Sequence, residues 1–213
     1  MIRWVEIRKF LDLEDVKLEG FGRVNIFLCD DTNAPWTSKV LQAIVLPSYL
    51  KSDSNLCYIG ECDVRSNLFE VKMKSNSYNI STKKNYSALY LGSPDFEILE
   101  YGNLGEFTLN ELISQVYSRY VYDVAEKTIC LDNFRGVGPI KALELAEFIG
   151  AYSKKQFFIS SFDAGFLLTM VCKTPKRSLR VFYKTKKLNS EEIENMLDYG
   201  SDLLLNLDSI LSD

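Results

Sequence analysis

The sequence predicts an α/β fold, with a mainly parallel sheet flanked by helices and an antiparallel β lobe. In the second half of the chain, helical segments alternate with continuous apolar runs, "TICLDN" at 128–133 and "QFFISSF" at 156–162. Continuous apolar runs between helices are typical of parallel strands that are buried on both faces. Residues 56–93 differ, because short runs rich in Val, Ile, Tyr and Phe are separated by Ser and Asn. That pattern indicates an antiparallel meander.

The remaining elements follow from local patterns. Residues 2–10 and 24–29 are predicted strands, with a turn at "LEGFGR" between them, and 38–48 is a predicted short helix. Apolar residues at three- and four-residue steps predict a helix over 109–124. The segment "GPIKALELAEFIGAY", 138–152, is a predicted helix with proline near its first turn.

Charge is segregated at the end of the chain. Residues 173–187 hold seven positive charges and no negative one, and 188–213 hold seven negative charges and no positive one. We expect the first segment to form a hairpin and the second to form two helices that are separated at Gly200. The expected organisation is a single domain over 1–213, with an α/β core at about 1–48 and 108–187, the antiparallel lobe at about 56–93, and an acidic helical tail at 188–213.

Composition excludes several classes of function. The chain has no histidine, which excludes histidine-based catalytic triads and histidine metal sites. Its five cysteines lack zinc-site spacing, so we expect no metal centre. The net charge of -4 predicts no general affinity for nucleic acid. No apolar stretch of about 18 residues and no signal peptide are evident, so we expect a cytoplasmic protein that does not cross a membrane.

The order of these parts resembles a known family. The segments "IRKF" (7–10), "VNIFLCDDTNAPWTS" (24–38) and "KVLQAI" (39–44) are similar to the opening of ABC-type ATPases of the SMC-like and overcoming-lysogenization-defect group. The meander is similar to that group's antiparallel lobe, and "TICLDN" resembles its Walker B strand. "QFFISSFDAGFL" is similar to the strand that normally ends in Thr-His-Ser. The resemblance implies a P-loop-NTPase-like fold, that of an ABC ATPase head.

The family's phosphate-binding residues are missing from the first motif. In that frame the Gly-Lys-Ser/Thr triplet falls on Trp36, Thr37 and Ser38, and the first glycine falls on Asp31. Thr37 therefore stands in place of the cation that would neutralise phosphate, and the Trp36 indole stands where backbone must approach the ligand closely. Lys39 lies one position past the triplet, about 200° around the helix from the motif's lysine position, so we expect it to point away from the loop.

Three further motifs depart from the family as well. Asp132 stands at the position of the Mg²⁺-binding aspartate, but Asn133 replaces the glutamate that activates water, and an amide cannot accept that proton. Phe162 replaces the switch histidine, and residues 108–112 lack the Ser-Gly-Gly signature. Without the family frame, "LDN" is also consistent with a strand end followed by a capping turn.

Together these departures predict a catalytically inactive homologue. It would need no cofactor and would act as an interaction, scaffold or regulatory subunit, with itself, an active ABC-type ATPase or a nuclease as partner. The resemblance suggests nucleic-acid maintenance or defence.

One alternative is weak ATP binding or unconventional NTPase activity, with ATP and Mg²⁺ held by Ser38, Lys39 and Asp132. Another is nucleic-acid binding, or binding of an acidic partner, through the basic stretch: Lys173, Lys176, Arg177, Arg180, Lys184, Lys186 and Lys187. The basic stretch could instead meet the acidic tail, and the whole chain could be an ordinary α/β domain.

Overall fold

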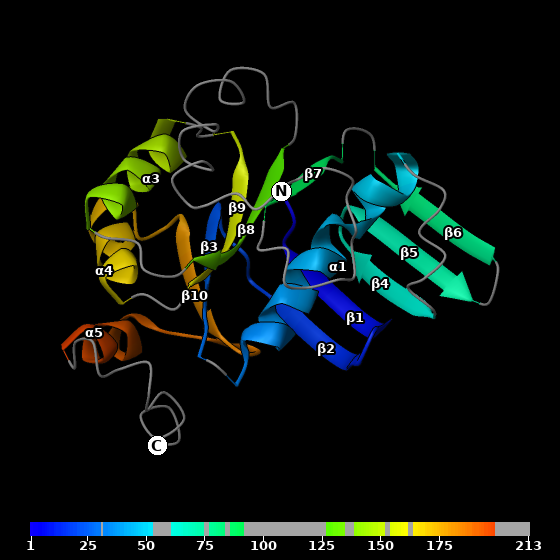
Figure 1. Ribbon diagram of the computed structural model, residues 1–213, viewed down its shortest axis with the longest axis horizontal. Coiled ribbons are helices and arrows are strands. Elements are labelled where there is room, and N and C mark those ends of the chain that lie inside the picture. The colour runs from blue at the N-terminus through cyan, green and yellow to red at the C-terminus, as the bar shows by residue number, and fades with distance from the viewer. Residues whose placement is uncertain are drawn as a thin grey trace.

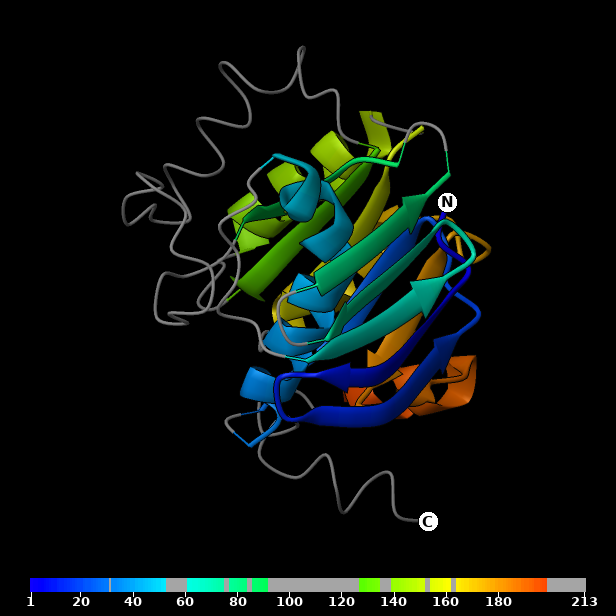
Figure 2. The same ribbon diagram turned by 90° about the vertical axis from the view of Figure 1, so that its right-hand side faces the viewer.

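The computed structural model contains two β-sheets with one long helix between them (Figures 1 and 2). It describes residues 1–30, 32–52, 61–74, 77–83, 86–91, 127–134, 139–151, 154–161 and 164–198. In Figure 1 the layers run from α3 and α4, through the mixed sheet and α1, to the antiparallel sheet. The chain is therefore an α/β protein, as its sequence predicts.

The antiparallel sheet has the strand order β2-β1-β4-β5-β6, and all of its pairings are antiparallel. Its strands are β1 (Trp4–Phe10), β2 (Leu13–Glu19), β4 (Cys62–Ser66), β5 (Phe69–Lys74) and β6 (Ser77–Thr82). Buried residues alternate with more exposed ones along β5, as expected for a sheet with one face on the core and one in water.

The mixed sheet has the strand order β11-β10-β3-β9-β8-β7. The pairings from β10 through to β7 are parallel, and only β10 and β11 pair in antiparallel fashion. Its strands are β3 (Val24–Leu28), β7 (Ala88–Leu91), β8 (Thr128–Phe134), β9 (Gln156–Ser161), β10 (Leu179–Tyr183) and β11 (Lys186–Lys187). Every residue of β3 and β9 is buried, because helices cover both faces of this sheet.

Two hydrophobic cores lie on the two faces of the mixed sheet. The first is shared by the antiparallel sheet, α1 (Ala34–Ser52) and one face of the mixed sheet, where Phe27, Phe158 and Phe182 point. The second joins the other face, which includes Ile26, to α3 (Pro139–Ala151) and α4 (Ala164–Lys173). α5 (Ser190–Asp198) lies against the second core. Because α1 has a sheet on each side, its residues from 40 to 47 are buried without interruption.

Several strand assignments made from sequence are wrong. β1 belongs to the antiparallel sheet, not to the α/β core, and its partner β2 falls where no strand was expected. The alternation of β2 is hidden because Asp15 has a φ of 53°, which places Leu13 and Val16 on the same buried side despite their odd spacing. β7 was expected within the antiparallel lobe, yet it pairs in parallel with β8.

Helix boundaries also differ from expectation. α1 begins at Ala34, four residues earlier than predicted, because the Asn33 carbonyl already accepts a hydrogen bond from the Thr37 N–H and proline is favourable in the first turn. α4 was not predicted. The expected helix over 109–124 and the second helix of the acidic tail lie outside the described residues. No helix in the described ranges is long and apolar enough to cross a membrane.

Candidate functional site

The loop between β3 and α1, residues 29–33, lies at the carboxyl edge of the parallel strands. Asp132 of β8, Ser160 of β9 and Tyr183 of β10 lie near the same edge, because their strands run parallel to β3. Ligands of open α/β sheets bind at such an edge. The structure therefore places the predicted loop and the predicted Walker B aspartate together.

The Asp30 carboxylate organises this loop. Its Oδ1 accepts hydrogen bonds from the backbone N–H of Thr32 at 2.8 Å and of Asn33 at 2.9 Å, and from the Thr32 hydroxyl at 2.5 Å. Its Oδ2 accepts a bond of 3.0 Å from the Tyr183 hydroxyl. Burial raises the pKa of Asp30, but these donors outweigh burial and hold the pKa below its ordinary value.

Asn33 completes the loop from the other side. Its Oδ1 accepts a hydrogen bond of 2.8 Å from the backbone N–H of Asp30, and its amide donates to the Leu28 carbonyl at 3.3 Å. The Asn33 carbonyl accepts from the N–H of Thr37 at 3.0 Å. The loop N–H groups of Asp30, Thr32 and Asn33 are thus satisfied by the chain's own side chains. A phosphate-binding loop would turn such groups toward its ligand.

The residues at the positions of the missing Gly-Lys-Ser/Thr triplet pack within the fold. Trp36 is half-buried and packs against the first core. Thr37 is buried, and its hydroxyl donates to the Asn33 carbonyl at 3.2 Å. Ser38 is buried as well. None of these three side chains supplies a cation to the loop.

Lys39 points away from the loop, toward the turn between β1 and β2. Its Nζ lies 2.6 Å from Asp12 Oδ2. The hydrogen bond from Lys39 is the largest cause of the lowered pKa of Asp12, although burial opposes it. An ammonium group held by this carboxylate is not directed at a ligand on the β3–α1 loop.

Asp132 is buried, and both of its oxygens already accept hydrogen bonds. Oδ2 accepts a bond of 2.6 Å from the Tyr90 hydroxyl of β7, and Oδ1 accepts from the Ser160 hydroxyl of β9. Burial, and then the adjacent Asp132 charge, raise the pKa of Tyr90 far above its usual range, so it stays a donor. These donors occupy oxygens that a metal ion would require.

The space beneath the loop is filled by further polar side chains. Cys29 is buried, and burial raises its pKa to about 12, while the Thr37 and Ser160 side chains lower it. Gln42 of α1 donates to the Tyr90 hydroxyl at 3.5 Å, and its Oε1 has no hydrogen-bond partner among the described residues. The described part of the chain holds no group of three carboxylate or cysteine side chains that could bind a metal ion. The described residues of the site therefore do not fit Mg²⁺ with ATP.

Part of the predicted site cannot be placed. Asp31, Phe162 and the signature region 108–112 lie outside the described residues. Asn133 belongs to β8, but its side chain also lies outside the described part.

The basic stretch 173–187 spans the end of α4, the turn after it and the β10–β11 hairpin. Lys186 lies 2.9 Å from Glu192, and Lys176 lies 3.7 Å from Glu194, so two of its charges meet carboxylates of α5. The side chains of Lys173, Arg177, Lys184 and Lys187 are exposed. Lys184 lies over the Tyr183 ring, with 5.1 Å between its Nζ and the ring centroid.

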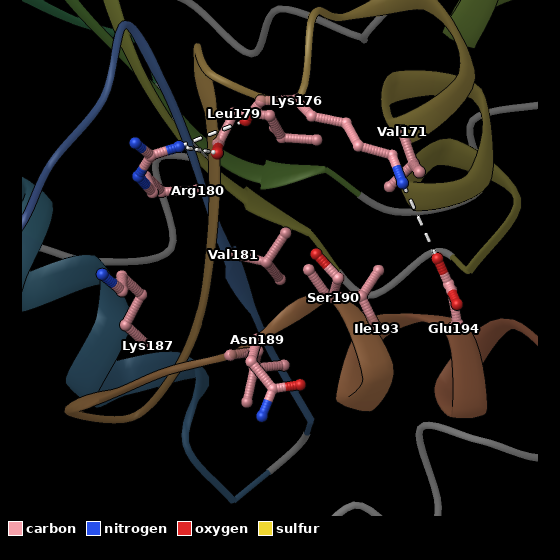
Figure 3. A pocket seen from close by; sticks show the side chains of 11 residues that line it. Val171, Lys176, Leu179, Arg180, Val181, Lys187, Asn189, Ser190, Ile193 and Glu194 are labelled. Atoms are coloured by element: carbon pink, nitrogen blue, oxygen red, sulfur yellow. Dashed lines mark hydrogen bonds and ion pairs between the residues drawn. The ribbon is translucent and has the colours of Figure 1, made fainter.

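A pocket of about 360 Å³ separates the hairpin from α5 (Figure 3). Leu179, Val181 and Ile193 give it apolar walls, and Lys176 reaches toward Glu194 across it. The Arg180 guanidinium is turned back onto the carbonyls of Lys176 and Leu179, at 3.2 and 2.6 Å. The stretch thus contacts the acidic helix that follows it.

Sequence reasoning missed the donors that satisfy the site. Tyr90, Ser160 and Tyr183 occur within or at the ends of apolar strands, where they look like ordinary core residues. A signal for the Asp30 interactions was present in "DDTNAP", because Asp, Thr and Asn before a helix favour side-chain bonds to nearby backbone N–H groups.

Comparisons with known proteins give little more. No protein-family model matches the chain, and no curated protein matches it. Among solved structures, the chain is similar to a nucleotide-free ATP-binding cassette from an ABC transporter. The two share 15% sequence identity and a TM-score of 0.42, over 93% of this chain and 96% of that chain.

Proposed function

We propose that this chain binds no nucleoside triphosphate and catalyses no hydrolysis, and that it acts as an interaction, scaffold or regulatory subunit. The observation that carries the proposal is the Asp30 carboxylate, which occupies the backbone N–H groups of Thr32 and Asn33 in the β3–α1 loop. A carboxylate there does for the loop what a bound phosphate does in a nucleotide site, but it belongs to the protein.

Electrostatics disfavour a phosphate at this loop. A phosphate about 4 Å from the Asp30 carboxylate would meet a repulsion of about 1–4 kcal/mol per pair of unit charges, depending on solvent access. Lys39, the cation that the unconventional-NTPase alternative requires, is bound to Asp12 at 2.6 Å. The ligand would therefore have to displace a resident anion without Lys39 to offset the cost.

The same geometry weighs against the unconventional-NTPase alternative. That alternative needs Ser38, Lys39 and Asp132 to converge on one ligand. Ser38 is buried, Lys39 is paired with Asp12, and Asp132 is bonded to two hydroxyl groups. The proposal of a partner rests on the sequence resemblance, which suggests another copy of this chain, an active ABC-type ATPase or a nuclease in nucleic-acid maintenance or defence.

Calorimetry with Mg-ATP tests the first part of the proposal. We expect no saturable heat for the wild type or for Lys39→Ala. Micromolar binding by the wild type that Lys39→Ala abolishes would contradict the proposal and support the NTPase alternative. Asp30→Ala, which removes the resident carboxylate, is the matched variant for the loop.

Two further measurements test the mode of action. Sedimentation velocity over a wide concentration range reports self-association, and affinity purification from the native host reports other partners. Recovery of an ABC-type ATPase or nuclease in stoichiometric amount would support the proposal, whereas a monomer with no partner would contradict it. Salt-dependent DNA binding that is lost on charge reversal at Lys176, Arg177 and Arg180 would favour the nucleic-acid alternative instead.

A further inference from the structure

The geometry points to a binding site for a phosphate-sized anion at the amino edge of the mixed sheet, opposite the β3–α1 loop. A pocket of about 180 Å³ lies there. Lys83 follows β6, Lys127 precedes β8 and Lys154 precedes β9, and all three line it together with Met1, Leu68, Tyr86 and Thr128. We call this site the lysine pocket. It stands apart from the proposed function.

The backbone around the lysine pocket is held in place. The Lys83 N–H donates to the Leu68 carbonyl at 2.8 Å, and the Lys127 N–H donates to the Ser87 carbonyl at 3.3 Å. The Lys127 carbonyl in turn accepts a bond of 2.9 Å from the N–H of Gln156. The stems of these two lysines therefore start from fixed positions, even though the side chains are exposed.

The N-terminal segment, which forms another wall, is fixed as well. The Ile2 N–H donates a hydrogen bond of 2.7 Å to Gln156 Oε1, and the Ile2 carbonyl accepts one of 2.8 Å from Gln156 Nε2. Asn67 holds the Met1 carbonyl at 3.1 Å. The floor includes Tyr86 and Thr128, both buried. The walls of the pocket are thus held by hydrogen bonds and by buried side chains.

Charge in the lysine pocket is one-sided. Among the described residues, no carboxylate lines it and none pairs with Lys83, Lys127 or Lys154. Elsewhere on the same protein, Lys9 pairs with Glu14 and Lys39 pairs with Asp12. Three ammonium groups around one hollow, with no described carboxylate beside them and on a chain of net charge -4, attract an anion more strongly than the average surface does.

Size and chemistry define the class of ligand. Ligand pockets for drug-sized molecules are about 300–1,000 Å³, so 180 Å³ suits a small anion or one anionic head group. Lysine ammonium groups bind phosphate as compact point charges. The expected ligand is inorganic phosphate or the terminal phosphate of a small ester. A nucleic-acid backbone shares this chemistry, and the experiment separates the two sources.

Thermal unfolding at constant ionic strength, with phosphate replacing chloride, is the test. We expect phosphate to raise the Tm of the wild type in a saturable way. Each single change, Lys83→Ala, Lys127→Ala or Lys154→Ala, should weaken phosphate binding about two- to fivefold, since each removes one exposed charge. The triple variant should lose the saturable shift. These side chains are exposed, so the variants should fold.

Lys74→Ala is the matched control, because Lys74 is exposed and lies at the other end of the β5–β6 pair from Lys83. An unchanged phosphate response in the triple variant would overturn the proposal, as would an equal loss in the control. A parallel titration with a single-stranded 20-nucleotide DNA distinguishes the sources. Binding of DNA alone, with no response to phosphate, would also overturn the lysine pocket as a site for small anions.

Discussion

One side chain, Asp30, holds the β3–α1 loop in its conformation. Its carboxylate accepts hydrogen bonds from two backbone N–H groups and two hydroxyl groups, and the Asn33 side chain accepts from the Asp30 N–H. The sequence shows that a lysine and glycines are missing. It does not show this network, because hydrogen bonds to Tyr183 depend on how β10 is placed beside β3, and that pairing is set by the whole sheet.

Asp30→Ala should lower the free energy of unfolding by about 1–3 kcal/mol, because it leaves the loop donors without an acceptor. Partial exposure favours the lower end of this range. Urea unfolding at neutral pH measures the loss. Asp30→Asn is the matched variant, because it keeps an acceptor oxygen without the charge, and it should lose less.

The effect should also depend on pH. The folded pKa of Asp30 lies below its ordinary value of 3.8, so the ionised group stabilises the fold above that value. This stabilisation is lost as the pH falls through the folded pKa. The wild type and Asp30→Ala should therefore converge in stability on acidification. A difference that stays constant down to acid pH would contradict this role of the carboxylate.

Tyr90→Phe should destabilise the protein more than Tyr183→Phe. The first change leaves the buried Asp132 Oδ2 without the Tyr90 donor, which costs about 1–3 kcal/mol. The second removes one of four donors from the less buried Asp30. Chemical denaturation of both variants measures the difference. Equal losses would mean that Asp132 does not depend on Tyr90.

At the scale of elements, the parts that could be read from sequence are those with uninterrupted patterns. β8, β9 and α3 fall where their apolar runs and helical spacing predict them. β2 could not be predicted because Asp15, whose φ is 53°, interrupts the alternation of buried and exposed residues along the strand. β7 could not be assigned to the right sheet, because a short strand has the same composition whether its neighbour runs parallel or antiparallel.

Two glycines should respond in opposite ways to alanine. A Cβ on Gly22 would lie 2.6 Å from the Ser178 carbonyl oxygen, which accepts the first hydrogen bond of β3 from Val24. Gly22→Ala should therefore cost about 1–3 kcal/mol, as overpacking does. Gly150 in α3 has nothing within 4 Å of such a Cβ, so Gly150→Ala should stabilise the fold by about 0.5–1 kcal/mol. Thermal unfolding of both variants checks the signs, and a stabilising Gly22→Ala would refute the clash.

At the scale of the molecule, α1 joins two sheets into one structure. Its buried residues contribute to a core that includes Val64 and Val71 of the antiparallel sheet and Phe27 of the mixed sheet. Neither sheet buries its α1-facing side chains without this helix. We therefore expect the two sheets to unfold together.

Thiol reactivity tests this expectation. Burial raises the pKa of Cys62, in the antiparallel sheet, to about 12, and raises that of Cys130 in the mixed sheet as well. In a Cys57→Ser background, a thiol reagent should modify the exposed Cys172 at once and the buried thiols only on unfolding. Cys62 and Cys130 should become reactive at the same urea concentration. Separate midpoints would show that the sheets unfold independently.

The two hydrogen bonds between the Ile2 backbone and the Gln156 side chain have a consequence for folding during synthesis. The two residues are 154 positions apart, and β1 is an interior strand of its sheet, between β2 and β4. At about 5–20 residues per second, the ribosome needs on the order of ten seconds to deliver the second residue after the first. During that interval the N-terminal strand can pair with β2, and with β4 once β4 has been made, but it cannot yet form its hydrogen bonds with Gln156. Contacts of such long sequence separation slow folding. We therefore expect the last step of folding to be the docking of the N-terminal segment onto β9, which is synthesised late.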